Sequence, residues 1–217
     1  MIRLHHVPGS RSMRVLWLLE ELDLAYDLKT WSLTDGSLRS PEFRALSPAG
    51  RIPALEIDGR AIFESGAILQ YLTEREGRLA PRPDDAERAD FLGWVHFAET
   101  QGNILQQLNI HHIFLRPESA RSVPLMKLET KRLALTAQVL EDHLAGRDTL
   151  LASGFSAADC MLGFNIDALF RFVPIADYPH LAGYRERMGA RPAYRRALVR
   201  AGGDEIYAQD FYEVPNA

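Results

Sequence analysis

The stretch VPGSRS, residues 7–12, carries side chains that could take part in a reaction. It joins an expected strand to an expected helix. Ser10, Arg11 and Ser12 stand at the start of this helical pattern, where backbone N–H groups and the helix dipole favour an anion. Ser10 could also serve only as the cap of the helix. The residue types therefore predict an anion site, with three candidate side chains.

The cysteine and the histidines of the chain argue against disulfide, thiol-redox and metal sites. The one cysteine, Cys160, excludes an internal disulfide framework and any CxxC redox pair within the chain. We interpret Cys160 as a small buried apolar residue. The adjacent pairs His5-His6 and His111-His112 lack the spacing of metal ligands, so we expect no metal site.

A second candidate stretch is SPAGRIPALEIDGRAIFESGAIL, residues 47–69. Pro53 opens an expected strand, a position that an ordinary trans proline can also occupy. Glu64 and Ser65 precede an apolar helical pattern. The Ser65 N–H and hydroxyl would form a second anion site there, and the same pair could act as a helix cap.

These two stretches need a sheet and helices to position them. The hydrophobic periodicity predicts alternating strands and helices in the first 80 residues. We expect strands at 2–7, 25–31, 52–57 and 60–63, helices at 10–22 and 65–77, and one helical turn within the loop 32–50. Asp58-Gly59 is a strong two-residue hairpin turn. The order β-α-β-α-β-β-α predicts a mixed four-stranded sheet with helices on both sides.

The remainder of the chain is predicted to be helical. A proline-rich and acidic segment at 81–87 reads as a linker between an α/β domain, 1–80, and an all-α domain, 88–217. Helices are expected at 88–116, 122–146, 156–172, 178–190 and 192–201, followed by an irregular tail, 204–217. The sequence SAAD predicts a capping box in which Ser156 and Asp159 satisfy the first N–H groups of a helix.

Composition excludes several classes of protein. The 217 residues carry a net charge of −4, which argues against a nonspecific nucleic-acid partner. No apolar run is long enough to span a bilayer, so we expect no membrane partner. The sequence MIRLHHVPGSR lacks the apolar core of a signal peptide, and we therefore expect a cytoplasmic location.

Five segments, in the right order over nearly the whole chain, resemble the cytosolic glutathione transferase superfamily, in its bacterial, serine-loop form. They are SRSMRVLWLLEEL, SPAGRIPAL, FESGAILQYL, FSAADCMLGFNI and RPAYRRAL. The resemblance implies a thioredoxin-like N-terminal domain that binds glutathione, followed by the all-α domain. It also implies a homodimer. A tyrosine-type enzyme is excluded, because residues 4–8 contain no tyrosine.

For the first stretch, the resemblance implies that a hydroxyl near the start of the first helix donates to the glutathione sulfur. A free thiol with a pKa near ~8.5 is mostly protonated at neutral pH. A donated hydrogen bond and the helix end would favour the thiolate. Ser10 is the leading candidate, and Ser12 and Arg11 stay open as alternatives.

For the second stretch, the resemblance implies that the Ile52–Pro53 bond is cis and that the Ile52 backbone pairs with the cysteinyl residue of glutathione. Ser65 would bind the γ-glutamyl carboxylate, and Glu64 would accept from the γ-glutamyl ammonium. Arg51 could reach the glycyl carboxylate or be a solvated loop residue.

The resemblance therefore implies an enzyme that transfers alkyl or aryl groups to glutathione, with an apolar electrophile as second substrate and a role in detoxification. Glutathione would be the co-substrate, with no metal. Two alternatives stay open. One is a glutathione-dependent disulfide or peroxide reductase. The other is a non-catalytic binding protein that keeps the fold.

Overall fold

The computed structural model describes residues 1–203 and 206–215. The chain forms two compact units. The first contains Met1–Arg88 and the segment that begins at Gly189, and the second contains Ala89–Met188 and the described residues from Ile206 onward. Among the described residues, no helix has both the length and the apolar character that crossing a bilayer requires.

The first unit is built on a four-stranded mixed sheet, as predicted. Its strands are β1 (Ile2–His6), β2 (Asp27–Thr30), β3 (Ala54–Ile57) and β4 (Arg60–Phe63), in the order β2-β1-β3-β4. β1 is parallel to β2 and antiparallel to β3, and β3 pairs antiparallel with β4. Asp58 and Gly59 both have positive φ, which is the geometry of a tight two-residue hairpin.

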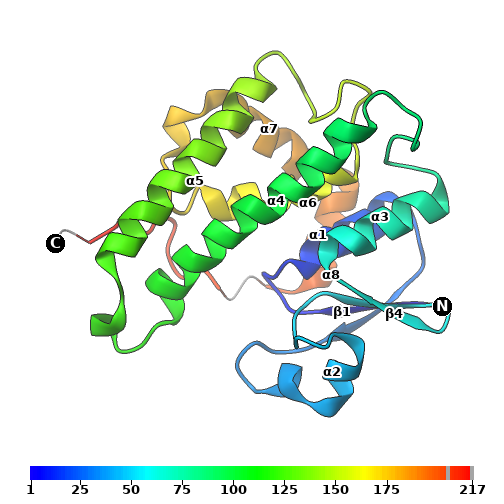
Figure 1. Ribbon diagram of the computed structural model, residues 1–217, viewed down its shortest axis with the longest axis horizontal. Helices are drawn as coiled ribbons and strands as arrows, with labels where there is room; N and C mark the ends of the chain where they lie inside the picture. The colour runs from blue at the N-terminus through cyan, green and yellow to red at the C-terminus, as the bar shows by residue number, and fades with distance from the viewer. Residues whose placement is uncertain (204–205, 216–217) are drawn as a thin grey trace. The chain divides into compact units, whose positions relative to one another are not determined.

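Helices cover both faces of this sheet (Figure 1). α1 (Ser12–Glu21) and α3 (Ser65–Glu76) lie on one face, and α2 (Pro41–Leu46), preceded by the 3-10 turn Ser37–Arg39, lies on the other. Because side chains alternate along a strand, consecutive residues of β1 face different helices. His6 contacts Ser12 of α1, whereas the ring of His5 lies near Phe43 of α2.

α8 (Pro192–Ala201) belongs to the first unit, which corrects the prediction that residues 88–217 form one domain. Trp17 of α1 packs on Tyr194, with ring centroids 4.6 Å apart. Arg191 donates two hydrogen bonds, of 2.6 and 2.8 Å, to the Glu21 carboxylate. These contacts join segments about 170 positions apart, so short-range periodicity could not reveal them.

The second unit is helical. It contains α4 (Arg88–Asn109, whose first residue belongs to the first unit), α5 (Val123–Leu144), α6 (Ala157–Leu169) and α7 (Pro179–Ala190, whose last two residues belong to the first unit), with shorter helical turns at Ile110–Phe114, Glu118–Ala120 and Ile175–Asp177. Residues 206–215 form no helix or strand, and the rest of the expected irregular tail lies outside the described residues.

α6 begins with the capping box that the sequence predicts. The Ser156 N–H donates to Asp159 Oδ2 at 2.7 Å, and the Ser156 side chain accepts from the backbone of Asp159. Asp159 is fully buried and also accepts from Tyr184 Oη and from the Leu150 N–H. This carboxylate therefore fixes the start of α6 and ties it to α7.

Candidate active site

The loop between β1 and α1 forms a tight turn. The Ser10 N–H donates to the Val7 carbonyl at 3.2 Å, and Gly9 adopts φ +72°. α1 begins at Ser12, two residues later than predicted, and Arg11 occupies the N-cap position without a capping side-chain hydrogen bond. Ser10 thus lies in the turn before the helix rather than inside it, and it is half-buried.

Ser12, in contrast, is fully buried in a polar cluster beneath this turn. Its Oγ lies 2.7 Å from Ser10 Oγ and 2.8 Å from His6 Nδ1, and it accepts from the Val7 N–H at 3.2 Å. The Ser12 N–H donates in turn to Ser10 Oγ at 3.3 Å. The structure therefore brings the two predicted hydroxyls together, with different exposure.

His6 is a member of this cluster that sequence reasoning missed. Its ring is fully buried between the sheet and α1, and Nε2 lies 2.9 Å from the carbonyl oxygen of Ala201, the last residue of α8. Burial lowers the pKa of His6, and the hydrogen bond to this carbonyl raises it in part. Strand alternation could have placed His6 on the α1 face, but nothing local indicates α8.

Arg14 is the second residue that the sequence analysis missed. It is fully buried, and its Nη1 donates to Ser65 Oγ at 2.9 Å. A guanidinium therefore stands behind the start of α3, where the sequence predicts an anion site. The available signal was an arginine inside the apolar run of the first helix, since a buried arginine requires polar partners.

The start of α3 differs from a serine cap. Ser65 is the first helical residue, and Glu64 occupies the N-cap position without a capping side-chain hydrogen bond. The prediction that Ser65 caps this helix is therefore wrong, because Ser65 lies one position inside the helix, where its hydroxyl accepts from Arg14. Glu64 has φ +70° and ψ 118°, an uncommon conformation for a residue with a side chain, and it is exposed. Such strain often occurs where a side chain is held for binding.

The segment before β3 has the predicted form. The Ile52–Pro53 bond is cis, and Pro53 is buried directly before Ala54. Arg51 is exposed, and its N–H donates to Ser47 Oγ at 3.2 Å. Gly50 is required here, because it has φ +63° and a Cβ atom would lie only 2.8 Å from the Leu38 carbonyl oxygen.

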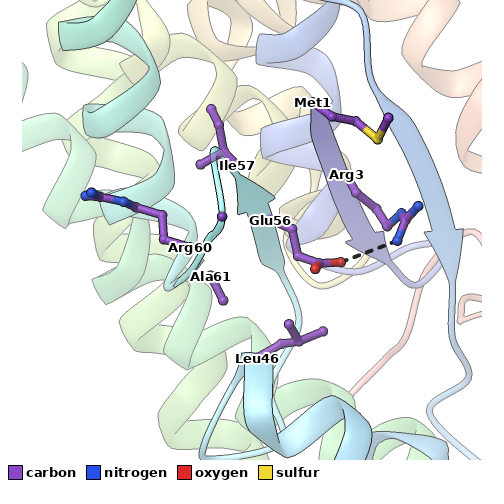
Figure 2. A pocket seen from close by; sticks show the side chains of 8 residues that line it. Met1, Arg3, Leu46, Glu56, Ile57, Arg60 and Ala61 are labelled. Carbon is purple, nitrogen blue, oxygen red and sulfur yellow. Dashed lines mark ion pairs between the residues drawn. The ribbon is translucent and has the colours of Figure 1, made fainter.

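A pocket of about 400 Å³ lies elsewhere, on the β1–β3–β4 sheet. Figure 2 shows the ion pair between Arg3 and Glu56 beside it, while Arg60 extends away from this pair. Glu56 also accepts from His5 Nε2 at 2.8 Å. The residues that line this pocket include none of the predicted site residues, so its size does not make it the candidate active site.

Within the part of the chain that the structure describes, no group of three or more histidine, cysteine, aspartate or glutamate side chains could hold a metal ion. The candidate site instead consists of hydroxyls, a buried histidine, a buried arginine and backbone groups at two helix starts. Such a set favours an anionic ligand and a hydrogen-bonded sulfur or oxygen.

Comparison with known proteins agrees with this fold. Family models described as glutathione S-transferase, N-terminal domain, and glutathione S-transferase, C-terminal domain, match residues 1–74 and 106–192. A thioredoxin-like unit joined to a helical unit is the architecture of glutathione transferases. The chain belongs to the glutathione S-transferase family.

Two relatives cover almost the whole chain. Glutathione S-transferase 3 of Schizosaccharomyces pombe is 32% identical over 92% of this chain and 88% of the relative. Disulfide-bond oxidoreductase YfcG of Escherichia coli is 33% identical over 94% of this chain and 98% of its own length. The similarity thus includes proteins named for two different reactions.

A solved structure is similar throughout the chain. A glutathione transferase family member from Pseudomonas fluorescens, described with two glutathione molecules bound, has a TM-score of 0.84 and 27% identity. The similarity covers 91% of this chain and 92% of that protein. A protein of this architecture therefore binds glutathione.

Proposed function

We propose that this protein is a glutathione S-transferase that binds glutathione in its first unit and activates it as a thiolate. The thiolate sulfur would attack an electrophilic carbon of an apolar substrate and form a C–S bond, with departure of a leaving group or addition to a double bond. The observation that carries the proposal is the half-buried Ser10 hydroxyl in the turn before α1.

The hydrogen bonds around the two serines support Ser10 as the group that meets the sulfur. Ser12 Oγ already has the His6 ring, the Val7 N–H and the Ser10 hydroxyl as partners, and a hydroxyl offers one donor and two acceptor positions. Ser12 is also fully buried. A bound thiol could reach Ser10 without removing any buried hydrogen bond of Ser12.

We assign the rest of glutathione to the second predicted stretch. The Ile52 backbone would pair with the cysteinyl residue, and Arg51 would bind the glycyl carboxylate. Ser65 at the start of α3, with the Arg14 guanidinium behind it, supports binding of the γ-glutamyl carboxylate. Glu64 would accept from the γ-glutamyl ammonium. We further propose a cytoplasmic homodimer, as the family resemblance implies.

Disulfide reduction by glutathione is a second candidate, favoured by the similarity to the oxidoreductase YfcG. The glutathione thiolate would attack one sulfur of a mixed disulfide, breaking the S–S bond and releasing a thiol after protonation. A second glutathione thiolate would then resolve a remaining glutathionyl disulfide. Cys160 is buried, so it gives no support to a thiol relay within the chain.

One set of assays tests both candidates. The full-length protein is first applied to immobilised glutathione, and its turnover is then measured with an aryl halide, a peroxide and a glutathionyl mixed disulfide. The proposal expects retention on the column and the highest kcat/KM with the aryl halide. A higher kcat/KM with the disulfide would favour the reductase. Retention without any turnover would favour a binding protein.

A further inference from the structure

An unbroken hydrogen-bonded chain runs from the turn before α1 to the end of α8. Ser10 Oγ lies 2.7 Å from Ser12 Oγ, and Ser12 Oγ lies 2.8 Å from His6 Nδ1. His6 Nε2 lies 2.9 Å from the Ala201 carbonyl oxygen. Ser12 and His6 are fully buried, whereas Ser10 is half-buried. The Ser10 end of this hydrogen-bonded series is therefore accessible, and the Ala201 end is inside the first unit.

The partners determine the direction of these hydrogen bonds. A carbonyl oxygen can only accept, so the neutral His6 ring carries its hydrogen on Nε2 and accepts at Nδ1. The Ser12 hydroxyl therefore donates to Nδ1 at 2.8 Å rather than to the Val7 carbonyl at 3.3 Å. Ser12 Oγ then accepts from the Val7 N–H and from the Ser10 hydroxyl. In the free protein, both hydroxyl hydrogens point toward His6.

This direction has a consequence for a thiol bound at Ser10. With its hydrogen committed to Ser12, the Ser10 hydroxyl meets an incoming thiol as an acceptor of the S–H group. Stabilising the thiolate requires the opposite, a Ser10 hydroxyl that donates to sulfur. The Ser10 hydroxyl must therefore reverse its hydrogen bond when the thiolate forms, and a proton passed along Ser10 and Ser12 would reverse both hydroxyls in one step.

We propose that His6 takes up the proton of the bound thiol through Ser10 and Ser12. The inference rests on the proposed function, because it needs the glutathione sulfur at Ser10. The S–H bond breaks and its electrons stay on sulfur, while its proton passes to Ser10 Oγ. The former hydrogen of Ser10 passes to Ser12 Oγ, and that of Ser12 passes to His6 Nδ1. The products are a thiolate and an imidazolium.

The groups of the hydrogen-bonded series Ser10–Ser12–His6 have as many hydrogen-bond partners after this step as before it. The imidazolium would donate from Nδ1 to Ser12 and from Nε2 to the Ala201 carbonyl. Ser12 would donate to Ser10, and Ser10 would donate to the thiolate. Ser12 Oγ would still accept from the Val7 N–H, so no buried hydroxyl loses a partner. His6 is thus a positioning residue that acts on sulfur through the two serines.

The surroundings of His6 suit an acceptor that begins neutral. Burial lowers its pKa, so the free ring is uncharged at neutral pH. Ala201 ends α8, and the negative end of a helix dipole favours a cation beside it. When the imidazolium forms, the thiolate at the other end of the chain supplies the opposite charge.

The charged side chains on the helices beside His6 have other partners. Arg14 of α1 donates to Ser65. Glu20 of α1 accepts from Arg196 of α8 at 2.8 Å and lies 3.9 Å from Arg200. Among the described residues, the Ser12 hydroxyl is the side-chain group hydrogen-bonded to the His6 ring, and the proposed relay reaches the ring through it.

His5 provides a matched control in the same strand. It is also buried, and burial also lowers its pKa. Its ring, however, accepts from Trp31 Nε1 at 3.0 Å and bonds to Glu56 at 2.8 Å, on the other face of the sheet. His5 therefore has a comparable environment without a hydrogen-bonded path to Ser10.

The test follows the ring nitrogens of both histidines by NMR in the full-length protein labelled with ¹⁵N-histidine. Spectra are recorded over pH without ligand, with saturating glutathione and with S-methylglutathione, which has no thiol proton. The proposal expects the His6 ring to change from the neutral Nε2–H form to imidazolium only with glutathione. The change should follow the thiolate absorbance, and His5 should not take part.

A thiolate that forms while His6 stays neutral would overturn the inference and leave the proposed function standing. Failure to bind glutathione would overturn both.

Two variants add a readout of proton release, measured by calorimetry in buffers of different ionisation enthalpy. Ser12→Ala and His6→Asn should release the thiol proton to solvent and raise the pKa of the bound thiol by about one unit, a ~10-fold loss of thiolate below that pKa. His5→Asn should change neither quantity. Equal proton release in wild type and Ser12→Ala would contradict the relay.

Discussion

The two ends of the candidate site are built by different means. The binding end, residues 50–53 and 64–65, depends on backbone geometry, with a cis proline, positive φ at Gly50 and Glu64, and the start of α3. The reactive end, around Ser10, depends on side-chain hydrogen bonds that reach a histidine and the end of α8. The first is local in sequence, whereas the second joins residues 195 positions apart.

Because of this difference, substitutions at the two ends should have two different effects. Changes at the binding end should weaken affinity for glutathione and leave the acidity of its thiol unchanged. Changes at the reactive end should alter the acidity of the thiol and leave affinity almost unchanged. Affinity and thiol pKa are separate measurements, so each variant below can be assigned to one end.

The largest effect is expected at Ser10. Ser10→Ala removes the hydroxyl that would donate to the thiolate, and a hydrogen bond to a charged group contributes about 1.5–3 kcal/mol. We expect kcat/KM to fall by ~10–100-fold and the pKa of bound glutathione to rise by one unit or more. Steady-state kinetics and thiolate absorbance measure these quantities. Unchanged turnover and thiol titration would show that Ser10 is not the activating group.

Gly50 tests the binding end. In Gly50→Ala, the added Cβ lies 2.8 Å from the Leu38 carbonyl oxygen at φ +63°, so the backbone that carries Arg51 and Pro53 must shift. We expect glutathione affinity to fall by ~10-fold, about 1.4 kcal/mol, with an unchanged thiol pKa. Gly59→Ala is the control, because φ is also positive but no atom lies within 4 Å. Equal affinities of the two variants would contradict the role of the Gly50 turn.

Arg14 lies between the two ends, and a double-mutant cycle assigns it to one of them. Arg14→Lys loses the planar guanidinium that donates to Ser65, so we expect glutathione affinity to fall by about 5-fold. Ser65→Ala removes the acceptor, and the two changes together should be less than additive because they break the same contact. Calorimetric titration of the three variants measures the coupling. Additive losses would place Arg14 outside the binding end.

The sequence predicted the binding end better because its signals are local. Pro53 and Asp58-Gly59 each determine a backbone conformation over a few residues, and the structure has the expected form at both. The SAAD capping box of α6 shows the same in the second unit. Ser65 shows the limit of this reasoning. A serine before an apolar helical pattern predicts a cap, but Ser65 is the first helical residue and its hydroxyl accepts from Arg14, which lies 51 positions away.

The reactive end was predicted only in part for the same reason. The sequence proposed Ser10, Arg11 and Ser12 and placed Ser10 first on the family resemblance alone, because the burial of Ser12 and its contact with His6 depend on the fold. The helix at 192–201 was also predicted, yet its position on α1 follows from the Trp17–Tyr194 contact and from paired charges. Periodicity identifies an apolar face without identifying the element that covers it.

The smallest effect concerns the pH dependence of stability without glutathione. The pKa of folded His6 lies below that of an unfolded histidine, near 6.5, so the unfolded chain binds more protons as pH falls below that value. Stability contributed by neutral His6 is therefore present above about pH 6.5 and is lost as pH falls toward the folded pKa.

The free energy of unfolding, measured with urea between pH 7.5 and 5, should fall less steeply with pH for His6→Asn than for wild type. His5→Asn should reduce the slope less, because Glu56 opposes the effect of burial on the pKa of His5. An equal slope in wild type and His6→Asn would show that the His6 ring is already solvated or protonated, and the reactive end would lose its neutral acceptor.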